Sequence, residues 1–289
     1  MRPWFWLTLV CALILPAVSC RLLPHDEPDT PAAPQQSEQR RPAIVFEEPH
    51  APPVRDVVMQ PEVPVEKPGV KLPRIAIIID DMGYHGSIGK DLLALDLNLT
   101  FSFLPKAPFT KQQEEEAWTK GRTILLHLPM QAKSKHWDPG PGALYISFSP
   151  QQIHSVVLED LKSIPHAVGC NNHMGSRFTE DRTCMREVLD VLKKRNLFFV
   201  DSYTTAASIG LDEARKMGVP TARRHVFLDN EQDTGTICRQ LDLLLSMAEK
   251  NGQAIGIAHP HRATLQALRR CGPHIHDRVE LVGVDALVY

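Results

Sequence analysis

The chain has 289 residues, and 43% of them are hydrophobic, which is enough for a substantial core and excludes a chain that is disordered throughout. Its formal net charge is -2 and its pI is about 6.7. A nucleic-acid-binding domain needs a basic surface stripe, so we expect no nucleic-acid partner.

Residues 1–20 have the composition of an export signal. A positive charge at Arg2 precedes an apolar run to Leu15, which is too short for a typical membrane-spanning helix. The tetrapeptide that ends at Cys20 is similar to a bacterial lipobox, so lipidation of Cys20, simple cleavage and an uncleaved anchor all stay open. Each alternative places the rest of the chain in the periplasm or cell envelope, with membrane contact only through this N-terminal lipid or anchor.

Residues 21–73 are rich in proline and in polar residues, and they read as an extended linker. Such a segment buries too little apolar area to offset the entropy of ordering it. The P-x-x-P spacing of Pro28, Pro31 and Pro34 also allows a motif for a proline-binding partner, although this spacing arises easily in so proline-rich a stretch.

Apolar runs of strand length alternate with helical patterns over residues 74–289, which we predict to form one domain. The runs lie at 75–79, 99–104, 123–128, 167–170, 197–201, 226–229, 254–259 and 279–284. Helices are predicted to begin at Pro150, capped by Ser149, and at Thr179, and a third is predicted to end at Gly252.

This alternation is typical of parallel strands joined by right-handed crossovers, in a doubly wound sheet or a (β/α) barrel. Seven or eight strand candidates favour the barrel. No G-x-G-x-x-G or Walker A segment follows a strand, which argues against nucleotide cofactors.

The run at 75–79 stops at two adjacent carboxylates, Asp80 and Asp81. The carboxyl ends of parallel strands carry the active site in α/β folds, so one acid could bind a cation while the other moves a proton. The alternative is ordinary capping of a helix that begins near Ser87.

Other strands also lead into polar side chains. They are His127, the sequence Asn171-Asn172-His173, Asp201, Asp229 and the pair His259 and His261. Aspartate and histidine are good ligands for a zinc-like divalent ion, and a catalytic ion needs three of them and an open position. With a second carboxylate as base and a histidine as acid, such a site hydrolyses an amide or ester.

The segments IAIIIDDMG, LLHLPM, GCNNHMGSRFT, FFVDS, RRHVFLDN and GIAHPH, in this order, resemble the divergent polysaccharide deacetylase family. That family is similar to the wider group of NodB-like carbohydrate esterases. The resemblance covers nearly all of residues 74–289. It implies an irregular (β/α) barrel of the glycoside hydrolase/deacetylase type that removes acetyl groups from an N-acetylated polysaccharide or a peptidoglycan-like substrate, using a divalent metal such as zinc.

The resemblance also implies roles for single residues. Asp80 would be the general base, His259 the general acid, and Asp81 and His127 metal ligands. The wider group has a second metal histidine four residues after the first, where this chain has Gln131, so we assign His173 as the third ligand. We expect a further set to support the site or bind substrate: Asn172, Arg177, Asp201, Asp229 and His261.

Two other functions compete with the deacetylase. The unusual Gln131 is compatible with a degenerate barrel that binds a glycan or an envelope protein without turnover. A metal-dependent amidase or peptidase is disfavoured because the chain has no H-E-x-x-H motif.

Cysteines and aromatic residues leave further questions open. The cysteines after the leader are Cys170, Cys184, Cys238 and Cys271, with no C-x-x-C pair, which argues against a zinc ribbon. Disulfides and buried free thiols are equally compatible with these cysteines. Four aromatic residues could stack on sugar rings or simply pack in the core: Tyr84, Trp118, Trp137 and Tyr145.

Overall fold

The structure is a computed structural model, and it describes residues 72–289. The predicted export signal and nearly all of the predicted linker therefore lie outside the described residues. Within residues 72–289, no helix has the length and apolar character needed to cross a bilayer.

A single sheet of nine strands forms the centre of the domain. Its order is β6-β5-β4-β3-β2-β1-β8-β7, with β9 paired to β1, and the strand pairings are parallel. The strands are β1 (Arg74–Met82), β2 (Thr100–Phe103), β3 (Ile124–Met130), β4 (Gly169–Met174), β5 (Phe198–Asp201), β6 (Thr221–Arg223), β7 (Val226–Phe227), β8 (Gln253–Ala258) and β9 (Glu280–Leu281).

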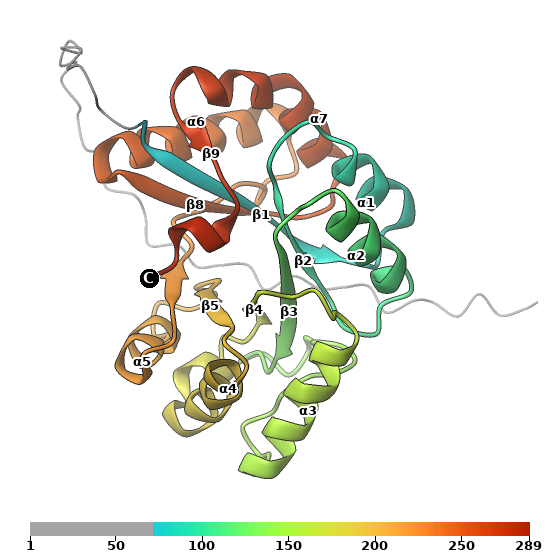
Figure 1. The fold of residues 1–289 in the computed structure, drawn as a ribbon, viewed down its shortest axis with the longest axis vertical. Coiled ribbons are helices and arrows are strands. Elements are labelled where there is room, and N and C mark those ends of the chain that lie inside the picture. The colour runs from blue at the N-terminus through green and yellow to red at the C-terminus, as the bar shows by residue number, and fades with distance from the viewer. Residues whose placement is uncertain (1–71) are drawn as a thin grey trace, which may run out of the picture. The chain divides into compact units, whose positions relative to one another are not determined.

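Helices surround this sheet and follow one another in the order α6, α7, α1, α2, α3, α4 and α5 (Figure 1). They are α1 (Gly86–Leu93), α2 (Thr110–Thr119), α3 (Pro150–Lys162), α4 (Arg182–Lys194), α5 (Gly210–Met217), α6 (Thr234–Asn251) and α7 (Arg262–Cys271), with short 3-10 helices η1 (Phe178–Glu180), η2 (Gly272–Asp277) and η3 (Val284–Leu287). The predicted irregular (β/α) barrel is thereby confirmed.

The two ends of the sheet are joined by only two residues of chain. The N–H of Arg224 donates to the carbonyl of Asp201 at the end of β5, and the N–H of His225 donates to the carbonyl of Ile255 in β8. Two successive amides therefore bond to β5 and β8, the strands next to the two ends of the sheet. The chain connects the two ends of the sheet at this link, which we call the β6–β7 seam, without a crossover helix.

The predicted elements match the observed ones with two differences. Each predicted apolar run contains or overlaps a strand, but β6 was missed because Ala222 is its only apolar residue. The helix predicted to begin at Thr179 instead begins at Arg182, because Asp181 is the N-cap whose side chain accepts from the N–H of Cys184. The predicted cap at Ser149 and the predicted end of α6 at Gly252 are both confirmed.

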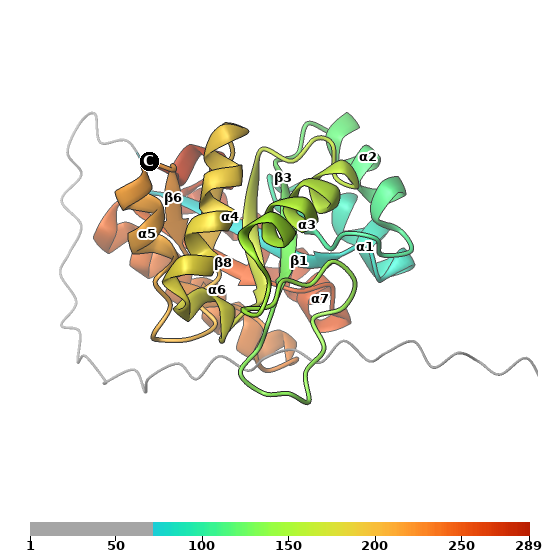
Figure 2. The same cartoon turned by 90° about the horizontal axis from the view of Figure 1, so that it is seen from below.

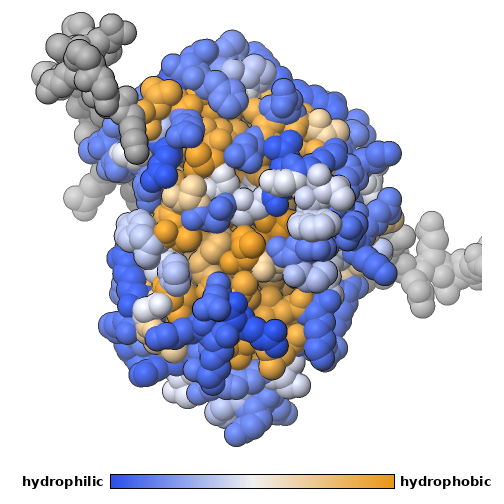
Figure 3. Space-filling model, viewed as in Figure 1, coloured by the Kyte–Doolittle hydropathy of each residue, from blue (hydrophilic) through white to orange (hydrophobic). Residues whose placement is uncertain are grey.

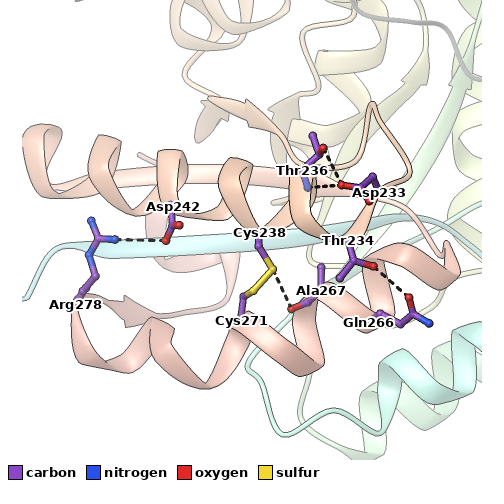
Figure 4. Close-up of a disulfide and its surroundings, with 9 residues drawn as sticks. All are labelled: Asp233, Thr234, Thr236, Cys238, Asp242, Gln266, Ala267, Cys271 and Arg278. Carbon is purple, nitrogen blue, oxygen red and sulfur yellow. Dashed lines mark hydrogen bonds and ion pairs between the residues drawn. A yellow bond between two sulfur atoms is a disulfide. The ribbon is translucent and has the colours of Figure 1, made fainter. Parts of the chain in front are cut away.

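A disulfide joins Cys238 of α6 to Cys271 of α7 (Figure 4). It resolves one of the questions that the sequence left open, because Cys170 and Cys184 are buried free thiols. Disulfides of this kind form in oxidising compartments.

The C-terminal segment packs inside the barrel at one of its two ends. Val284 and Leu287 of η3 pack in one cluster with inward-facing residues of the strands, such as Ile78 and Ile255. Figure 3 shows hydrophobic side chains gathered near the centre of one face of the molecule, with hydrophilic residues around them. The interior is thus a packed core at this end, and space for a site remains at the other end.

One buried carboxylate, Asp160, lies away from the polar residues at the strand ends, and the sequence analysis did not name it. The side chain of Asp160 in α3 is fully buried, and neither of its oxygens has a hydrogen-bond partner among the described residues. Lys106 Nζ lies 3.6 Å from Oδ1, and a side chain at Gly142 would collide with the carboxylate. Burial raises the pKa of Asp160 to about 7, although Lys106 opposes the shift.

We predict that Asp160 makes the stability of the domain depend on pH. The folded state holds this proton more tightly than the unfolded chain, so the free energy of unfolding should fall as pH rises from about 4 to about 7, by at most about 1.4 kcal/mol per pH unit. Asp160→Asn should remove this component. Urea unfolding of both proteins across that range measures it, and identical slopes would contradict the prediction.

Candidate active site

The inner face of the barrel changes from apolar to polar along the strands. Alternate residues of β1 place Ala76, Ile78 and then Asp80 on this face, and β8 places Ile257 before His259. Strand alternation does the same in β3, where Leu125 precedes His127. The polar end of the interior therefore follows from the two-residue period of the strands.

Asp81 departs from this alternation. Its predecessor Asp80 faces inward, so a regular strand would turn Asp81 toward the helices. Instead the register with β2 shifts between Ile79 and Met82, and Asp81 has a φ of 54°, a conformation uncommon for residues other than glycine. This bulge brings both carboxylates to the site.

The capping alternative for the two acids is wrong. Helix α1 begins at Gly86 with His85 at its N-cap position, and no side chain caps it by a hydrogen bond. Asp80 and Asp81 are instead buried, with 2% and 0% of their surface exposed.

Asp81, His127 and His173 meet at one point, as the sequence analysis predicted for metal ligands. Asp81 Oδ1 lies 3.2 Å from His127 Nε2 and 2.9 Å from His173 Nδ1, and these two nitrogens are 3.2 Å apart. Ligands placed about 2.0–2.1 Å from a tetrahedral zinc ion are about 3.3 Å from one another. The three atoms thus form a triangle close to one face of such a tetrahedron.

The chemistry of these donors also fits a cation. Both oxygens of Asp81 are buried and have no hydrogen-bond partner with acceptable geometry. His127 Nδ1 contacts the side-chain oxygen of Asn171 at 2.9 Å, which can only accept, so in the neutral ring Nε2 carries the lone pair. A buried carboxylate and a ring lone pair directed at one point are costly unless a cation or proton lies between them.

Asp80 and Asp81 have different electrostatic environments. Burial raises the pKa of Asp80, and His127, His259 and the Asn171 amide oppose the shift only in part. Burial acts in the same direction on Asp81, but His173, His127 and His259 together hold the pKa of Asp81 well below its ordinary value. Asp81 is therefore suited to remain a charged ligand, and Asp80 to accept a proton.

His259 is held by Asp229. Its Nδ1 donates to Asp229 Oδ1 at 3.0 Å, and its backbone N–H donates to Asp229 Oδ2 at 2.6 Å. Thr264 Oγ1 donates to the same oxygen. Burial by itself would lower the pKa of His259, but Asp229 outweighs it and raises the pKa to about 9. The other ring nitrogen, Nε2, lies 3.9 Å from Asp81 Oδ2.

These residues line a small cavity of about 30 Å³. Its lining includes Asp80, His127, His173 and His259, and its aromatic wall is Phe227, which the sequence analysis did not name. A water molecule needs roughly 10–15 Å³ of such space, so the cavity can hold a water and a small group beside it.

The four aromatic residues considered for sugar stacking do not line this cavity. Trp118 is exposed and stacks on His166, and Tyr145 packs edge-on against Phe148. The signal for Phe227 in the sequence is weak, because it differs from a core residue only in its place next to a strand end.

The predicted supporting residues take different positions. Asn172 lines the cavity and accepts from the N–H of Ser202, while His261 lies beside His259, with 5.9 Å between the ring centroids. Asp201 instead accepts hydrogen bonds from its own loop, including Ser208 Oγ, and Arg177 is exposed. The structure brings Asp229 directly to His259, as described above.

Asn171 is the residue that the predicted site lacked. It is fully buried on the inner face of β4, and its side chain contacts both His127 and Asp80. The sequence named the Asn171-Asn172-His173 stretch, but strand alternation applied from His173 would have selected Asn171 rather than Asn172 for the inner face.

Gln131 does not belong to the candidate metal centre. Its side-chain oxygen accepts from the N–H of Ile146 at 3.0 Å, and its N–H donates to the carbonyl of Leu144. It therefore holds the long loop between β3 and α3, which extends away from the other elements (Figure 2). The triangle of candidate ligands forms without it.

We predict that Gln131→Glu leaves the metal content of the purified protein unchanged, because the side chain at this position faces Ile146. His173→Ala should reduce the bound metal strongly, since it removes one corner of the triangle. Elemental analysis of both variants beside the wild type measures this. A gain of metal in Gln131→Glu, or no loss in His173→Ala, would show that the ligand set is different.

The fold and these side chains define a class: a (β/α) barrel with a buried Asp-His-His triangle, a second carboxylate and an Asp-His pair at the carboxyl ends of its strands. The chain belongs to the divergent polysaccharide deacetylase family, whose model matches residues 77–288. The resemblance seen in the sequence is thereby confirmed.

Two proteins and one solved structure are similar to this chain. An uncharacterized protein of Haemophilus influenzae is 34% identical over 216 residues, which cover 74% of this chain and 76% of that protein. The protein YibQ of Escherichia coli K12 is 32% identical over 215 residues, covering 74% of this chain and 67% of YibQ. A crystal structure of an uncharacterized protein from Agrobacterium tumefaciens is similar in fold, with a TM-score of 0.73, 26% identity and coverage of 77% of this chain and 92% of that one.

Proposed function

We propose that this protein is a metal-dependent hydrolase that removes acetyl groups from an N-acetylated polysaccharide of the cell envelope, such as peptidoglycan. The observation that carries the proposal is the geometry of Asp81, His127 and His173 beside a cavity that also exposes Asp80 and His259. Family membership supports this class of substrate. A divalent ion, with zinc as our choice, would act at this site as a Lewis acid and lower the pKa of a water molecule.

The chain's own residues would move the protons. Asp80, with its raised pKa and one oxygen bonded to Asn171, would take a proton from the attacking water. His259 would donate a proton from Nε2 to the amine of the sugar, while Asp229 keeps Nδ1 protonated and the ring oriented. A C–O bond forms and the amide C–N bond breaks, which releases acetate and a free amine.

The alternative of a degenerate barrel depended on Gln131 in place of a metal ligand. Because Gln131 Oε1 bonds to the N–H of Ile146 and the ligand triangle forms without it, this substitution no longer argues against catalysis. Acetate release from N-acetylglucosamine oligomers or peptidoglycan fragments tests the two functions. Equal glycan binding by wild type and His259→Ala, with no turnover by either, would establish the binding protein instead.

We predict that Asp229→Asn lowers the rate of acetate release by at least about 100-fold, because the amide cannot replace the carboxylate that holds His259 protonated and oriented. Metal bound at the Asp81-His127-His173 triangle should be retained, since Asp229 is outside it; Asp229 belongs with His259 and His261 to a second group that could hold an ion. The matched control is Glu114→Gln. Glu114 is also a buried carboxylate that accepts from a histidine Nδ1, that of His166 at 2.9 Å, but it belongs to α2, outside the cavity lining.

If both variants lose activity equally, the loss reflects disturbed folding and not the position of His259. If Asp229→Asn retains the wild-type rate, His259 is not the general acid that this mechanism requires.

We propose that the protein acts outside the cytoplasm, in the periplasm or cell envelope, and that Cys20 anchors it by a lipid. The export-like residues 1–20 motivate the proposal, and the Cys238–Cys271 disulfide supports it because such bonds persist in oxidising compartments.

Thiol labelling of intact cells and lysates tests this localisation. In the full chain Cys238 should be protected from alkylation, whereas a variant that lacks residues 1–20 should remain in the cytoplasm with Cys238 reduced and labelled. Cys20→Ser should move the protein from the membrane fraction to the soluble envelope fraction. Recovery of the full chain from the cytoplasm would contradict the proposal.

A further inference from the structure

Asn171 uses all of its hydrogen-bonding capacity inside the barrel. Its Oδ1 contacts Ser102 Oγ at 2.5 Å and His127 Nδ1 at 2.9 Å. Its Nδ2 donates to Asp80 Oδ1 at 2.8 Å and to Ser202 Oγ at 3.1 Å. An asparagine side chain has two lone pairs and two N–H groups, so each is matched by one partner.

The partners determine which way the amide lies. An ionised Asp80 can only accept a hydrogen bond, so the NH₂ group of Asn171 must face Asp80 and the oxygen must face His127. The oxygen can only accept, so His127 must carry its proton on Nδ1. In the neutral ring Nε2 is then unprotonated, and this is the atom 3.2 Å from Asp81 Oδ1.

The same amide holds the candidate base. The bond to Asp80 Oδ1 fixes one oxygen of the carboxylate, and the other, Oδ2, lies on the side of His127 Nε2 at 3.7 Å. Asn171 thus connects a residue of the metal triangle to the residue that would take the proton from water. Asn171 lies in β4, and its partners come from four other strands or their ends: β1, β2, β3 and β5.

We propose that Asn171 is a positioning residue with two separable effects: its oxygen sets the tautomer in which His127 can bind the metal, and its NH₂ group orients Asp80. The second effect rests on the proposed deacetylase function, whereas the first does not. Outer residues of this kind typically change metal affinity by about 10- to 100-fold when they are replaced.

Two substitutions separate the effects. Asn171→Asp keeps oxygens that accept from His127 and Ser102 but replaces the NH₂ donor to Asp80 with a second carboxylate. In Asn171→Leu the new side chain has a similar size but lacks both the oxygen and the NH₂ group. Ser102→Ala is the control, because it deletes one partner of the Asn171 oxygen and leaves the His127 contact in place.

The first measurements do not need activity. In the metal-free full chain, at a pH high enough that the His127 ring is neutral, ¹⁵N spectra of the histidine side chains should show His127 protonated on Nδ1 in the wild type, Asn171→Asp and Ser102→Ala, but not in Asn171→Leu. Competition with a chromophoric chelator should show Zn²⁺ binding about 10- to 100-fold weaker in Asn171→Leu, and no weaker than wild type in Asn171→Asp.

The activity measurement then isolates the effect on the base. Asn171→Asp should release acetate at least about 100-fold more slowly than wild type while it still binds Zn²⁺. Wild-type turnover by Asn171→Asp, or wild-type tautomer and Zn²⁺ affinity in Asn171→Leu, would overturn the proposal. If the wild type itself releases no acetate, the proposed function fails, and the tautomer and affinity measurements still decide the role of Asn171.

Discussion

The burial of two adjacent carboxylates in one strand is the constraint on which the site depends. Side chains of a strand alternate between its faces, so Asp80 and Asp81 can share a face only if the strand is interrupted. The bulge in β1 and the left-handed backbone of Asp81 provide that interruption. Because an uncompensated buried charge is costly, three imidazoles and an amide have to lie around the pair.

This compensation is unequal, and the inequality separates the two roles. Asp81 is surrounded by His127, His173 and His259, whereas Asp80 has the neutral amide of Asn171 as its short-range partner. Two groups with the same chemistry and adjacent positions therefore differ in their tendency to hold a proton. Environment, and not residue type, gives the two carboxylates the different properties that the proposed ligand and the proposed base require.

Much of this arrangement could be predicted from the sequence because it follows from strand order. Parallel strands carry their C-terminal residues to one rim, so Asp81, His127, His173 and His259 could be grouped without coordinates. The fold followed from the same alternation. Two predicted features differ from the structure. The strand β6 has too few apolar residues to be recognised, and the start of α4 depends on a single contact, because Asp181 rather than Thr179 caps it.

Other features could not be read from local patterns at all. The pairing of Cys238 with Cys271 depends on how α6 packs on α7, and the direction of the Gln131 side chain depends on a loop that returns to it at Ile146. The role of Asn171 depends on partners from four other elements, separated from it in sequence by between 31 and 91 residues. Such contacts become visible only in three dimensions.

The β6–β7 seam has a consequence for how the family's scaffold can change. At Arg224 and His225 the chain passes from β6 to β7 with no helix between the two strands. A cavity of about 270 Å³ lies beside this link, between β7 and α6. A segment inserted between these two residues would emerge directly on the outer surface and displace no helix. The seam is therefore a place where the barrel could acquire a new element without interrupting a helix.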